Sequence, residues 1–370
     1  MKRTDFSVDW LFAACAPDTE LLPWNAQFTP VDLPHDWQIR HADDLYRDGT
    51  LFYRKYFFVT DVPGTRRMLW FGGAYMDTTV FVNGTEVGQW KYGYTSFWFD
   101  ITDALHEGQN EVLVRCNLRH PNSRWYSGAG LYRNVELWEA PDLHLMPDGL
   151  YVAAKEGDNG AWTVAVTAEV GSITAASTGR TLTLHLTDDN GSLLGTAAIP
   201  ADAWVALPSP DGWRTGKETA IYKASHTFTL QDPALWDLDA PNFYHITAEL
   251  TGADGVTDTL TTRFGCRTIE ATPDCGLLVN HKRVLIKGVC IHHDFGCLGS
   301  AFEYSAAKRQ LEILKSMGVN SIRTGHTPPA PQFMDLADEM GILMDVESFD
   351  CWRNGKNPYD YGRFFDEWQE

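Results

Sequence analysis

Toward its carboxyl end the chain alternates short apolar strands with amphipathic helices, and each of these strands runs directly into polar residues. Strands that alternate with helices of this length predict right-handed βαβ units and a parallel sheet. In barrels built from such units, the chemistry lies at the carboxyl ends of the strands. We expect strands at 284–291, 319–323 and 341–346, and helices at 305–317 and 330–340.

These units predict only part of a (β/α)8 barrel. A complete barrel of this type needs roughly 250 residues, whereas about 90 residues are available from position 280 onward. The outer strands of the partial sheet would have unpaired edges, which natural folds normally cover. We therefore expect a fragment of a longer polypeptide, or a chain that meets another one. The segment 364–370 is expected to be a helix that is cut off at the end of the sequence, since it carries no stop signal.

The part of the chain before the barrel is typical of β-sandwiches. Residues 1–142 contain many short strands, and the dipeptide Asn83-Gly84 is a strong hairpin signal. They predict a jelly-roll domain of the type that binds sugars. Residues 143–272 predict an immunoglobulin-like sandwich without a disulfide. The predicted fold is thus multidomain, with a jelly roll, an immunoglobulin-like sandwich and, over 273–370, the first three β/α units of a TIM barrel.

Composition excludes several function classes. The formal net charge of −19 argues against nucleic acid and anionic membranes as partners, because both attract Lys and Arg. No transmembrane run or signal peptide is visible in the sequence. The seven cysteines are scattered and form no CxxC pair, so neither a disulfide framework nor a zinc site is indicated. A cytoplasmic location is the expectation.

Several distinctive motifs follow one another along the whole chain. They are Leu33-Pro34-His35-Asp36-Trp37, Tyr53-Arg54-Lys55, Asn83-Gly84, 123–135 (SRWYSGAGLYRNV), Phe264-Gly265-Cys266-Arg267, Lys287-Gly288-Val289, His292-His293-Asp294, Arg323-Thr324-Gly325-His326 and 345–350 (DVESFD). In this order the motifs resemble the amino-terminal half of glycoside hydrolase family 2. Among the branches of this family the resemblance is greatest to bacterial β-galactosidases.

The resemblance implies a retaining mechanism with two glutamates, one acting as nucleophile and the other as acid/base. In the family these glutamates follow later barrel strands than the three expected here. Glu367 and Glu370 belong to the expected terminal helix, and no Asn-Glu pair occurs in 353–370. We therefore expect no catalytic residue in this segment, and we expect the segment alone to be inactive.

The residues after the expected strands are then candidates for the rim of a sugar site. A carboxylate accepts hydrogen bonds that a neutral side chain could not, and an indole beside it suits the apolar face of a pyranose. Arg323 and Glu347 are expected to support the site, by pairing with each other or with a catalytic carboxylate. The alternative for this pair is a purely structural buried ion pair. For the candidate contacts, the alternatives are a solvated loop for His293 and Asp294, a structural histidine for His326, and packing under the loop for Trp352. The expected substrate contacts are His293, Asp294, His326, Asp350 and Trp352.

The other motifs are expected to have mainly structural roles. Arg124, Trp125 and Tyr126 are predicted to be interface residues first and substrate contacts second, while His35 and Asp36 are expected to anchor a turn. Metal binding by the cluster 292–294 is disfavoured because adjacent side chains diverge. No cofactor can be assigned, although sodium or magnesium is possible by family analogy.

Two classes of function remain open. The first is an exo-acting retaining β-galactosidase, with β-glucuronidase and β-mannosidase as alternatives. The second is a non-catalytic carbohydrate-binding or assembly module. The expected partner is a β-glycoside, and the resemblance implies a homo-oligomer in the full-length protein.

Overall fold

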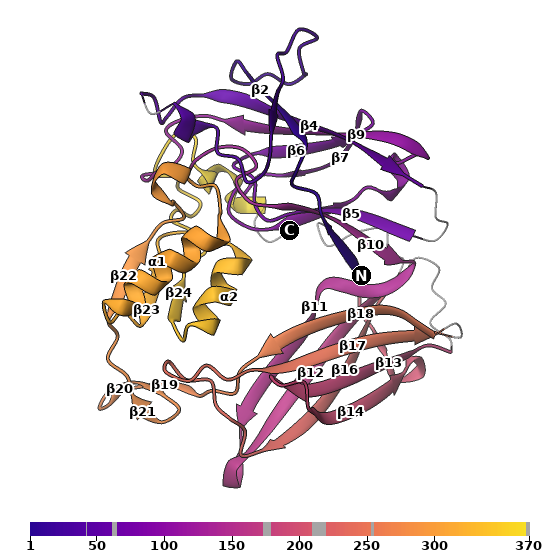
Figure 1. Ribbon diagram of the computed structural model, residues 1–370, viewed down its shortest axis with the longest axis vertical. Helices are drawn as coiled ribbons and strands as arrows, with labels where there is room; N and C mark the ends of the chain where they lie inside the picture. Colours follow the sequence, from indigo (N-terminus) through magenta and orange to yellow (C-terminus); the bar gives the residue numbers. More distant parts are fainter. Residues whose placement is uncertain (42, 61–64, 173–178, 209–219, 253–254, 368–370) are drawn as a thin grey trace.

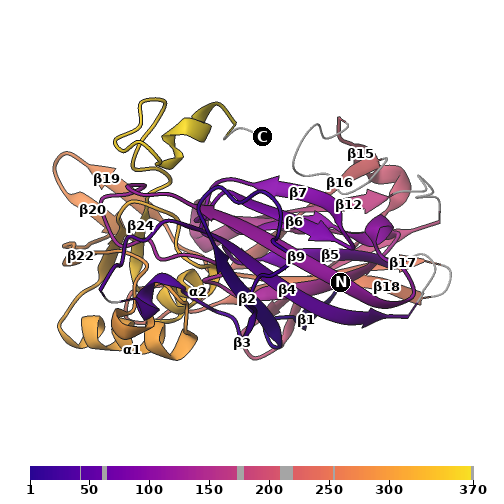
Figure 2. The ribbon, with the colours of Figure 1, turned by 90° about the horizontal axis from the view of Figure 1, so that it is seen from above.

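Two β-sandwiches and a βα segment make up the molecule (Figure 1). The computed structural model describes residues 1–41, 43–60, 65–172, 179–208, 220–252 and 255–367. The sandwiches lie one above the other in Figure 1, and Figure 2 shows the βα segment packed at one end of them. Within the described ranges, no helix has the length and apolar character needed to cross a membrane.

The first sandwich packs one sheet of order β1-β10-β5-β8 against another of order β3-β2-β4-β9-β6-β7. Its strands alternate inward and outward side chains, and Val112, Val114 and Cys116 of β9 are fully buried. The strands are β1 (Lys2–Asp5), β2 (Trp10–Cys15), β3 (Thr29–Val31), β4 (Gly49–Val59), β5 (Thr65–Phe71), β6 (Thr78–Val82), β7 (Thr85–Trp90), β8 (Phe97–Asp100), β9 (Gly108–Leu118) and β10 (Val135–Pro141).

The predicted hairpin at Asn83-Gly84 is confirmed. These residues join β6 to β7 with φ angles of 50° and 81°. Two positive φ angles match the right-handed twist of the flanking strands, and Asn and Gly tolerate them best.

The second sandwich has sheets of order β11-β12-β16-β15 and β14-β13-β17-β18. Its core contains Trp162, Val164 and Val166 from alternate positions of β12. Cys266 is buried beside this core as a free thiol, as expected for a sandwich without a disulfide. The strands are β11 (Leu143–Glu156), β12 (Ala161–Ser172), β13 (Thr181–Asp188), β14 (Leu193–Pro200), β15 (Val205–Ala206), β16 (Ala220–Gln231), β17 (Tyr244–Gly252) and β18 (Gly255–Phe264).

A small antiparallel sheet leads from the second sandwich into a parallel one. The parallel strands have the order β22-β23-β24, with Val289 beside Ile322 and Ile322 beside Met344. Both helices pack apolar side chains against this sheet. The elements are β19 (Ile269–Thr272), β20 (Gly276–Val279), β21 (Lys282–Arg283), β22 (Gly288–Ile291), α1 (Tyr304–Ser316), β23 (Ser321–Thr324), α2 (Pro331–Glu339) and β24 (Leu343–Val346).

Three alternating strands and two helices in parallel order confirm the predicted start of a TIM barrel. The first expected strand is too long, however. Lys282 and Arg283 pair with β20, so residues 284–287 cross between two sheets and only β22 joins the barrel.

The expected terminal helix is also wrong in type, because Tyr361–Glu367 is a 3₁₀ helix and residues 368–370 lie outside the described ranges. The Asp360 carboxylate accepts the backbone N–H groups of Asn357 and Gly362 at 2.7 and 3.0 Å, which holds the chain in a tight bend before that helix.

Candidate active site

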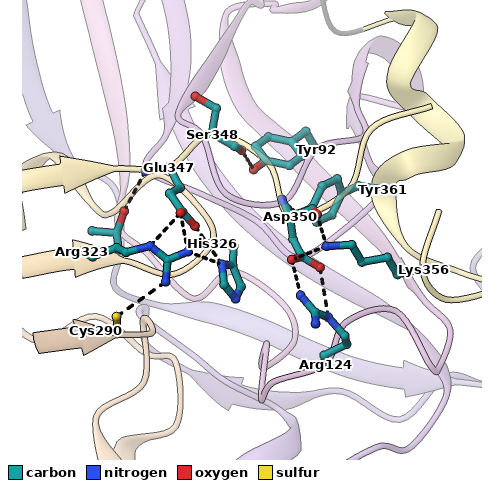
Figure 3. A network of polar contacts seen from close by, with 11 residues as sticks. Tyr92, Arg124, Cys290, Arg323, His326, Glu347, Ser348, Asp350, Lys356 and Tyr361 are labelled. Atoms are coloured by element: carbon teal, nitrogen blue, oxygen red, sulfur yellow. Dashed lines mark hydrogen bonds and ion pairs between the residues drawn. The ribbon is translucent and has the colours of Figure 1, made fainter. Parts of the chain in front are cut away.

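Arg323, His326 and Glu347 form one polar cluster at the carboxyl ends of β23 and β24 (Figure 3). The Arg323 Nε–H donates to Glu347 Oε1 at 2.8 Å, and His326 Nδ1 lies 2.8 Å from Glu347 Oε2. Arg323 also reaches the Cys290 Sγ on β22, at 3.6 Å. The cluster therefore spans all three parallel strands, and the expected pairing of Arg323 with Glu347 is confirmed.

The electrostatics of Glu347 favour its ionised form. Desolvation raises its pKa, but the hydrogen bonds from His326 and Arg323 outweigh that effect, and the net pKa is lowered. A carboxyl group that acts as a general acid near neutral pH needs a raised pKa instead. Glu347 is thus arranged to hold cationic and imidazole groups in place, and its environment is unlike that of a proton donor.

Asp350 belongs to a second cluster, which joins the loop after β24 to the first sandwich. The Arg124 guanidinium binds both carboxylate oxygens, and the Lys356 ammonium lies 2.9 Å from Oδ1 (Figure 3). The Tyr361 hydroxyl accepts the Asp350 backbone N–H. Although desolvation raises the pKa of Asp350, Lys356 and Arg124 lower it overall. Lys356 and Tyr361 carried no signal in the sequence that would have linked them to Asp350.

Trp352 presents the most exposed aromatic ring near these clusters, with 59% of its surface accessible. Its ring lies 5.7 Å from that of Phe349 and 6.0 Å from that of Phe365. These neighbours support the indole while a large part of it remains open. An open indole of this kind is suited to pack against an apolar ring face.

The loop 123–130 of the first sandwich reaches over the strand ends. The Trp125 ring stacks on the His292 ring with 5.4 Å between centroids and 5° between planes. It also lies 5.3 Å from the His326 ring. Trp125 is only 7% exposed and also belongs to the hydrophobic core of the first sandwich, so little of its ring is open to a ligand. The predicted interface role of this loop is what its geometry supports, and the neighbouring His292 was not among the predicted site residues.

His293 and Asp294 are arranged differently from the other predicted site residues. The His293 ring packs edge-on to Tyr94 and tilted against Tyr132, and its Nε2 lies 2.9 Å from the Ser127 carbonyl oxygen. Burial lowers the pKa of His293 to about 4. This is the setting of a neutral structural histidine, whereas the sequence left a solvated loop residue as the alternative to a substrate contact. The Asp294 carboxylate makes no hydrogen bond to any residue within the described ranges.

Arg133 connects the sandwich to the loop that carries His326. This side chain is 2% exposed and donates to the backbone oxygens of Gly72, Tyr94 and Pro328 at 3.0, 2.8 and 3.2 Å. Tyr92 adds another tie, because its hydroxyl donates to the Ser348 carbonyl oxygen (Figure 3). Neither residue was among the predicted site residues, because the backbone oxygens that tie them to the barrel segment, those of Pro328 and Ser348, lie 195 and 256 positions away.

A metal ion finds no ready set of ligands here. Among the residues that the structure describes, no group of three or more His, Cys, Asp or Glu side chains lies close enough together to hold one. The described donors do not by themselves form the sodium or magnesium site that the family analogy allows.

Sequence profiles of one enzyme family match successive parts of the chain. The profile described as the sugar binding domain of glycosyl hydrolases family 2 matches residues 23–141. The profile described simply as glycosyl hydrolases family 2 matches residues 148–267, and the TIM barrel domain of the same family matches residues 271–360.

The chain is also similar to individual proteins that are named as glycosidases. A beta-galactosidase from Bacteroides ovatus is 35% identical, and the match covers 100% of this chain and 44% of that protein. A putative beta-glucuronidase from Formosa agariphila is 32% identical over 99% of this chain and 35% of its own length. The chain thus spans less than half the length of these relatives.

Solved structures agree with this arrangement. A glycosyl hydrolase family 2 member from Bacteroides cellulosilyticus superimposes with a TM-score of 0.88 at 29% identity, over 100% of this chain and 48% of that one. A beta-glycosidase from Bacteroides vulgatus gives a TM-score of 0.84 at 28% identity, over 100% and 47% of the two chains.

Proposed function

The chain belongs to glycoside hydrolase family 2, and from that membership we propose that it is the amino-terminal part of a retaining exo-glycosidase acting on terminal β-galactosides. Its role in that enzyme is to supply one wall of the sugar site. The observation that carries the proposal is the meeting of the β23 and β24 ends with the sandwich loop 123–130. The acidic, imidazole and indole side chains gathered there are of the kinds that bind sugar hydroxyls and ring faces.

The two catalytic glutamates of the proposed enzyme are not among the residues of this chain. A retaining mechanism needs one carboxyl group as a nucleophile and a second one as acid/base. Glu347 and Asp350 are each held by two cationic or imidazole partners, with lowered pKa values. Glu347 is thereby committed to positioning its neighbours. His326, Asp350 and Trp352 are the substrate contacts that this geometry favours, whereas His293 has the setting of a support.

A neutral sugar suits the described wall better than a uronate does. A glucuronide carboxylate needs a cation that is free to bind it. At the described strand ends Arg323 is already paired with Glu347, and Arg124 and Lys356 are paired with Asp350. β-Glucuronidase remains the second candidate, favoured by the similarity to the protein from Formosa agariphila.

We also propose a cytoplasmic location and a homo-oligomer for the complete enzyme. The free state of all seven cysteines supports a reducing compartment. Size-exclusion chromatography with light scattering on the complete enzyme measures the oligomeric state.

Hydrolysis of a panel of nitrophenyl β-glycosides tests the main proposal. The 370-residue chain and the complete enzyme are assayed side by side on galactoside, glucuronide and mannoside. We expect cleavage only by the complete enzyme, with the highest kcat/KM on the galactoside. Cleavage by the 370-residue chain would contradict the placement of the catalytic pair, and Glu347→Gln would then be the first variant to make. A glucuronide preference would contradict the substrate assignment alone.

A further inference from the structure

Asp36 is a buried carboxylate for which turn formation alone does not account. It lies in the connection between β3 and β4, within the motif Leu33-Pro34-His35-Asp36-Trp37, and it is 3% exposed. Burying a charged group is costly unless hydrogen bonds compensate for the lost water. The expectation that Asp36 anchors a turn covers only its bond to the Gln38 backbone N–H, at 3.0 Å.

The remaining hydrogen bonds come from two segments far along the chain. From the sandwich loop, the Tyr126 hydroxyl donates to Oδ2 at 2.6 Å and the Ala129 N–H donates to Oδ1 at 3.1 Å. From the barrel loop after β22, the Ser300 N–H and Oγ–H donate to Oδ2 at 2.8 and 3.0 Å. One carboxylate thus joins the first sandwich to the barrel.

The same two segments carry the candidate site. The sandwich loop holds Trp125 against His292 and His326, and its Arg124 binds Asp350. The barrel loop begins at His292, directly after β22. The relative position of these loops therefore decides where the Trp125 ring meets the histidines.

Two glycines show how closely the backbone surrounds this carboxylate. A Cβ at Gly128 would lie 1.8 Å from Ser300 Oγ and 2.6 Å from Asp36 Oδ2. A Cβ at Gly299 would lie 2.3 Å from Asp36 Oδ2. Both glycines also have positive φ angles. The backbone on either side can approach Asp36 only because no side chain intervenes.

We propose that Asp36 is a positioning residue of the glycosidase site: it locks the sandwich loop 123–130 to the barrel loop 292–300 and thereby sets Trp125 against His292 and His326. The proposal rests on the proposed function for its catalytic consequence, whereas the locking itself does not depend on it.

The carboxylate is required because all of its neighbours donate. An ionised carboxylate accepts at both oxygens, whereas an amide has one accepting oxygen and an NH₂ group that donates. In Asp36→Asn the NH₂ group faces either the Ser300 and Tyr126 donors or the Ala129 and Gln38 donors, whichever way it turns. The shape is retained while one side of the lock is lost.

The kinetic test compares Asp36→Asn with Asp32→Asn in the complete enzyme. Asp32 is an exposed carboxylate four residues earlier, and its Oδ1 accepts the Asp9 backbone N–H at 2.9 Å. Because displacing a contact by about 1 Å costs up to roughly 100-fold in rate, we expect Asp36→Asn to lower kcat/KM by about 10- to 100-fold. Asp32→Asn should stay within about twofold of wild type. Equal values for the two variants would overturn the proposal.

A second readout separates positioning from general destabilisation. The enzyme is labelled with 5-fluorotryptophan, and the ¹⁹F resonance of Trp125 is assigned from its loss in Trp125→Phe. In Asp36→Asn we expect the Trp125 resonance to shift or broaden while resonances of the distant second sandwich, such as Trp162, stay in place. A Trp125 resonance identical to wild type would refute the lock.

If Asp36→Asn does not fold, Tyr126→Phe and Ser300→Ala take its place, because each removes one donor and leaves the carboxylate. Each should shift the Trp125 resonance in the same direction by a smaller amount, and unchanged resonances in both variants would overturn the proposal. A complete wild-type enzyme that cleaves no glycoside contradicts the proposed function alone, since the fluorine resonance still reports on the lock.

Discussion

Two histidines, His35 buried within the first sandwich and His293 in the barrel loop after β22, have strongly lowered pKa values. Burial lowers the pKa of both His35 and His293 to about 4. The His35 Nδ1 lies 2.8 Å from the Tyr53 hydroxyl, and His293 is bonded to Ser127. Because an unfolded histidine has a pKa near 6.5, these residues make the stability of the folded chain depend on pH in the acidic range.

The first prediction concerns the pH dependence of stability. Below pH 6.5 His35 binds a proton in the unfolded state, whereas in the folded state it stays neutral down to about pH 4. The free energy of unfolding therefore decreases as the pH falls from about 6.5 to about 4. Between pH 7.5 and 5.0 the loss from His35 is about 2 kcal/mol. Urea unfolding at both pH values should show a smaller decrease for His35→Gln than for wild type. An equal decrease in the two proteins would contradict a neutral buried His35.

The second prediction concerns Trp352 as a sugar platform. Its open ring contributes little to folding, so Trp352→Ala should unfold close to the wild-type temperature while the KM of the complete enzyme rises about tenfold, or about 1.4 kcal/mol of binding. Trp24→Ala is the matched control, because Trp24 is 97% exposed on the first sandwich. Steady-state kinetics on the galactoside measure both variants. A KM that moves equally in the two would count against a platform at Trp352.

At the scale of elements, the ends of α1 and α2 dock onto the segment 236–238, which lies in the connection between β16 and β17 of the second sandwich. The Trp236 Nε1–H donates to the Asp338 carbonyl oxygen at 2.9 Å, and the Lys315 ammonium reaches the Leu238 carbonyl oxygen at 3.2 Å. Gly341 ends α2 at a φ of 64°, directly against Leu238. The same glycine therefore ends a helix and permits the contact between domains.

The third prediction separates these two roles of glycine. Gly341→Ala places a Cβ 2.1 Å from the Leu238 carbonyl oxygen, whereas Gly318→Ala, after α1 at a φ of 87°, meets nothing within 4 Å. Gly318→Ala should cost about 1 kcal/mol for its left-handed backbone alone. Gly341→Ala should cost about 3 kcal/mol or more, because backbone must also move. Chemical denaturation measures the free energy of unfolding of both variants. Equal decreases would show that the backbone at Leu238 can move aside at no cost.

At the scale of the whole molecule, the parts differ in how far each closes its own core. The second sandwich buries a continuous cluster between two sheets, including Trp162, Leu184 and Ile246. The parallel sheet has helices packed against it, but β22 and β24 lie at its edges in the described chain. It also depends on the first sandwich through Asp36 and Arg133.

The fourth prediction follows from this difference. A fragment of residues 143–272 should unfold cooperatively, with dispersed amide resonances, because its hydrophobic cluster is complete. A fragment of residues 273–370 should remain unfolded or aggregate, since both edges of its sheet are open. Circular dichroism and proton NMR of the two fragments also test the proposed boundaries. A folded, monomeric 273–370 fragment would contradict this account of the barrel segment.

Local patterns alone predicted the order of elements. Period-two burial in β9 and β12, the Asn83-Gly84 turn and the alternation of strand and helix after 284 each depend on neighbours a few residues apart. The pairing of Arg323 with Glu347 was also accessible, because adjacent parallel strands bring their ends together. Residues 284–287 were wrongly assigned to a strand, because the passage of the chain from one sheet to the next has no local signal.

The sequence by itself determined the family, the succession of two sandwiches and a barrel, and the strand ends that carry the candidate site. Only the tertiary structure decided how the parts meet: Trp125 on His292, Arg124 and Lys356 on Asp350, and Asp36 on Ser300, 264 positions away. Backbone propensity and hydrophobic periodicity act over a few residues, so they can be recognised in a short stretch of sequence. A hydrogen bond between distant loops depends on the packing of whole domains, and a short stretch of sequence does not predict it.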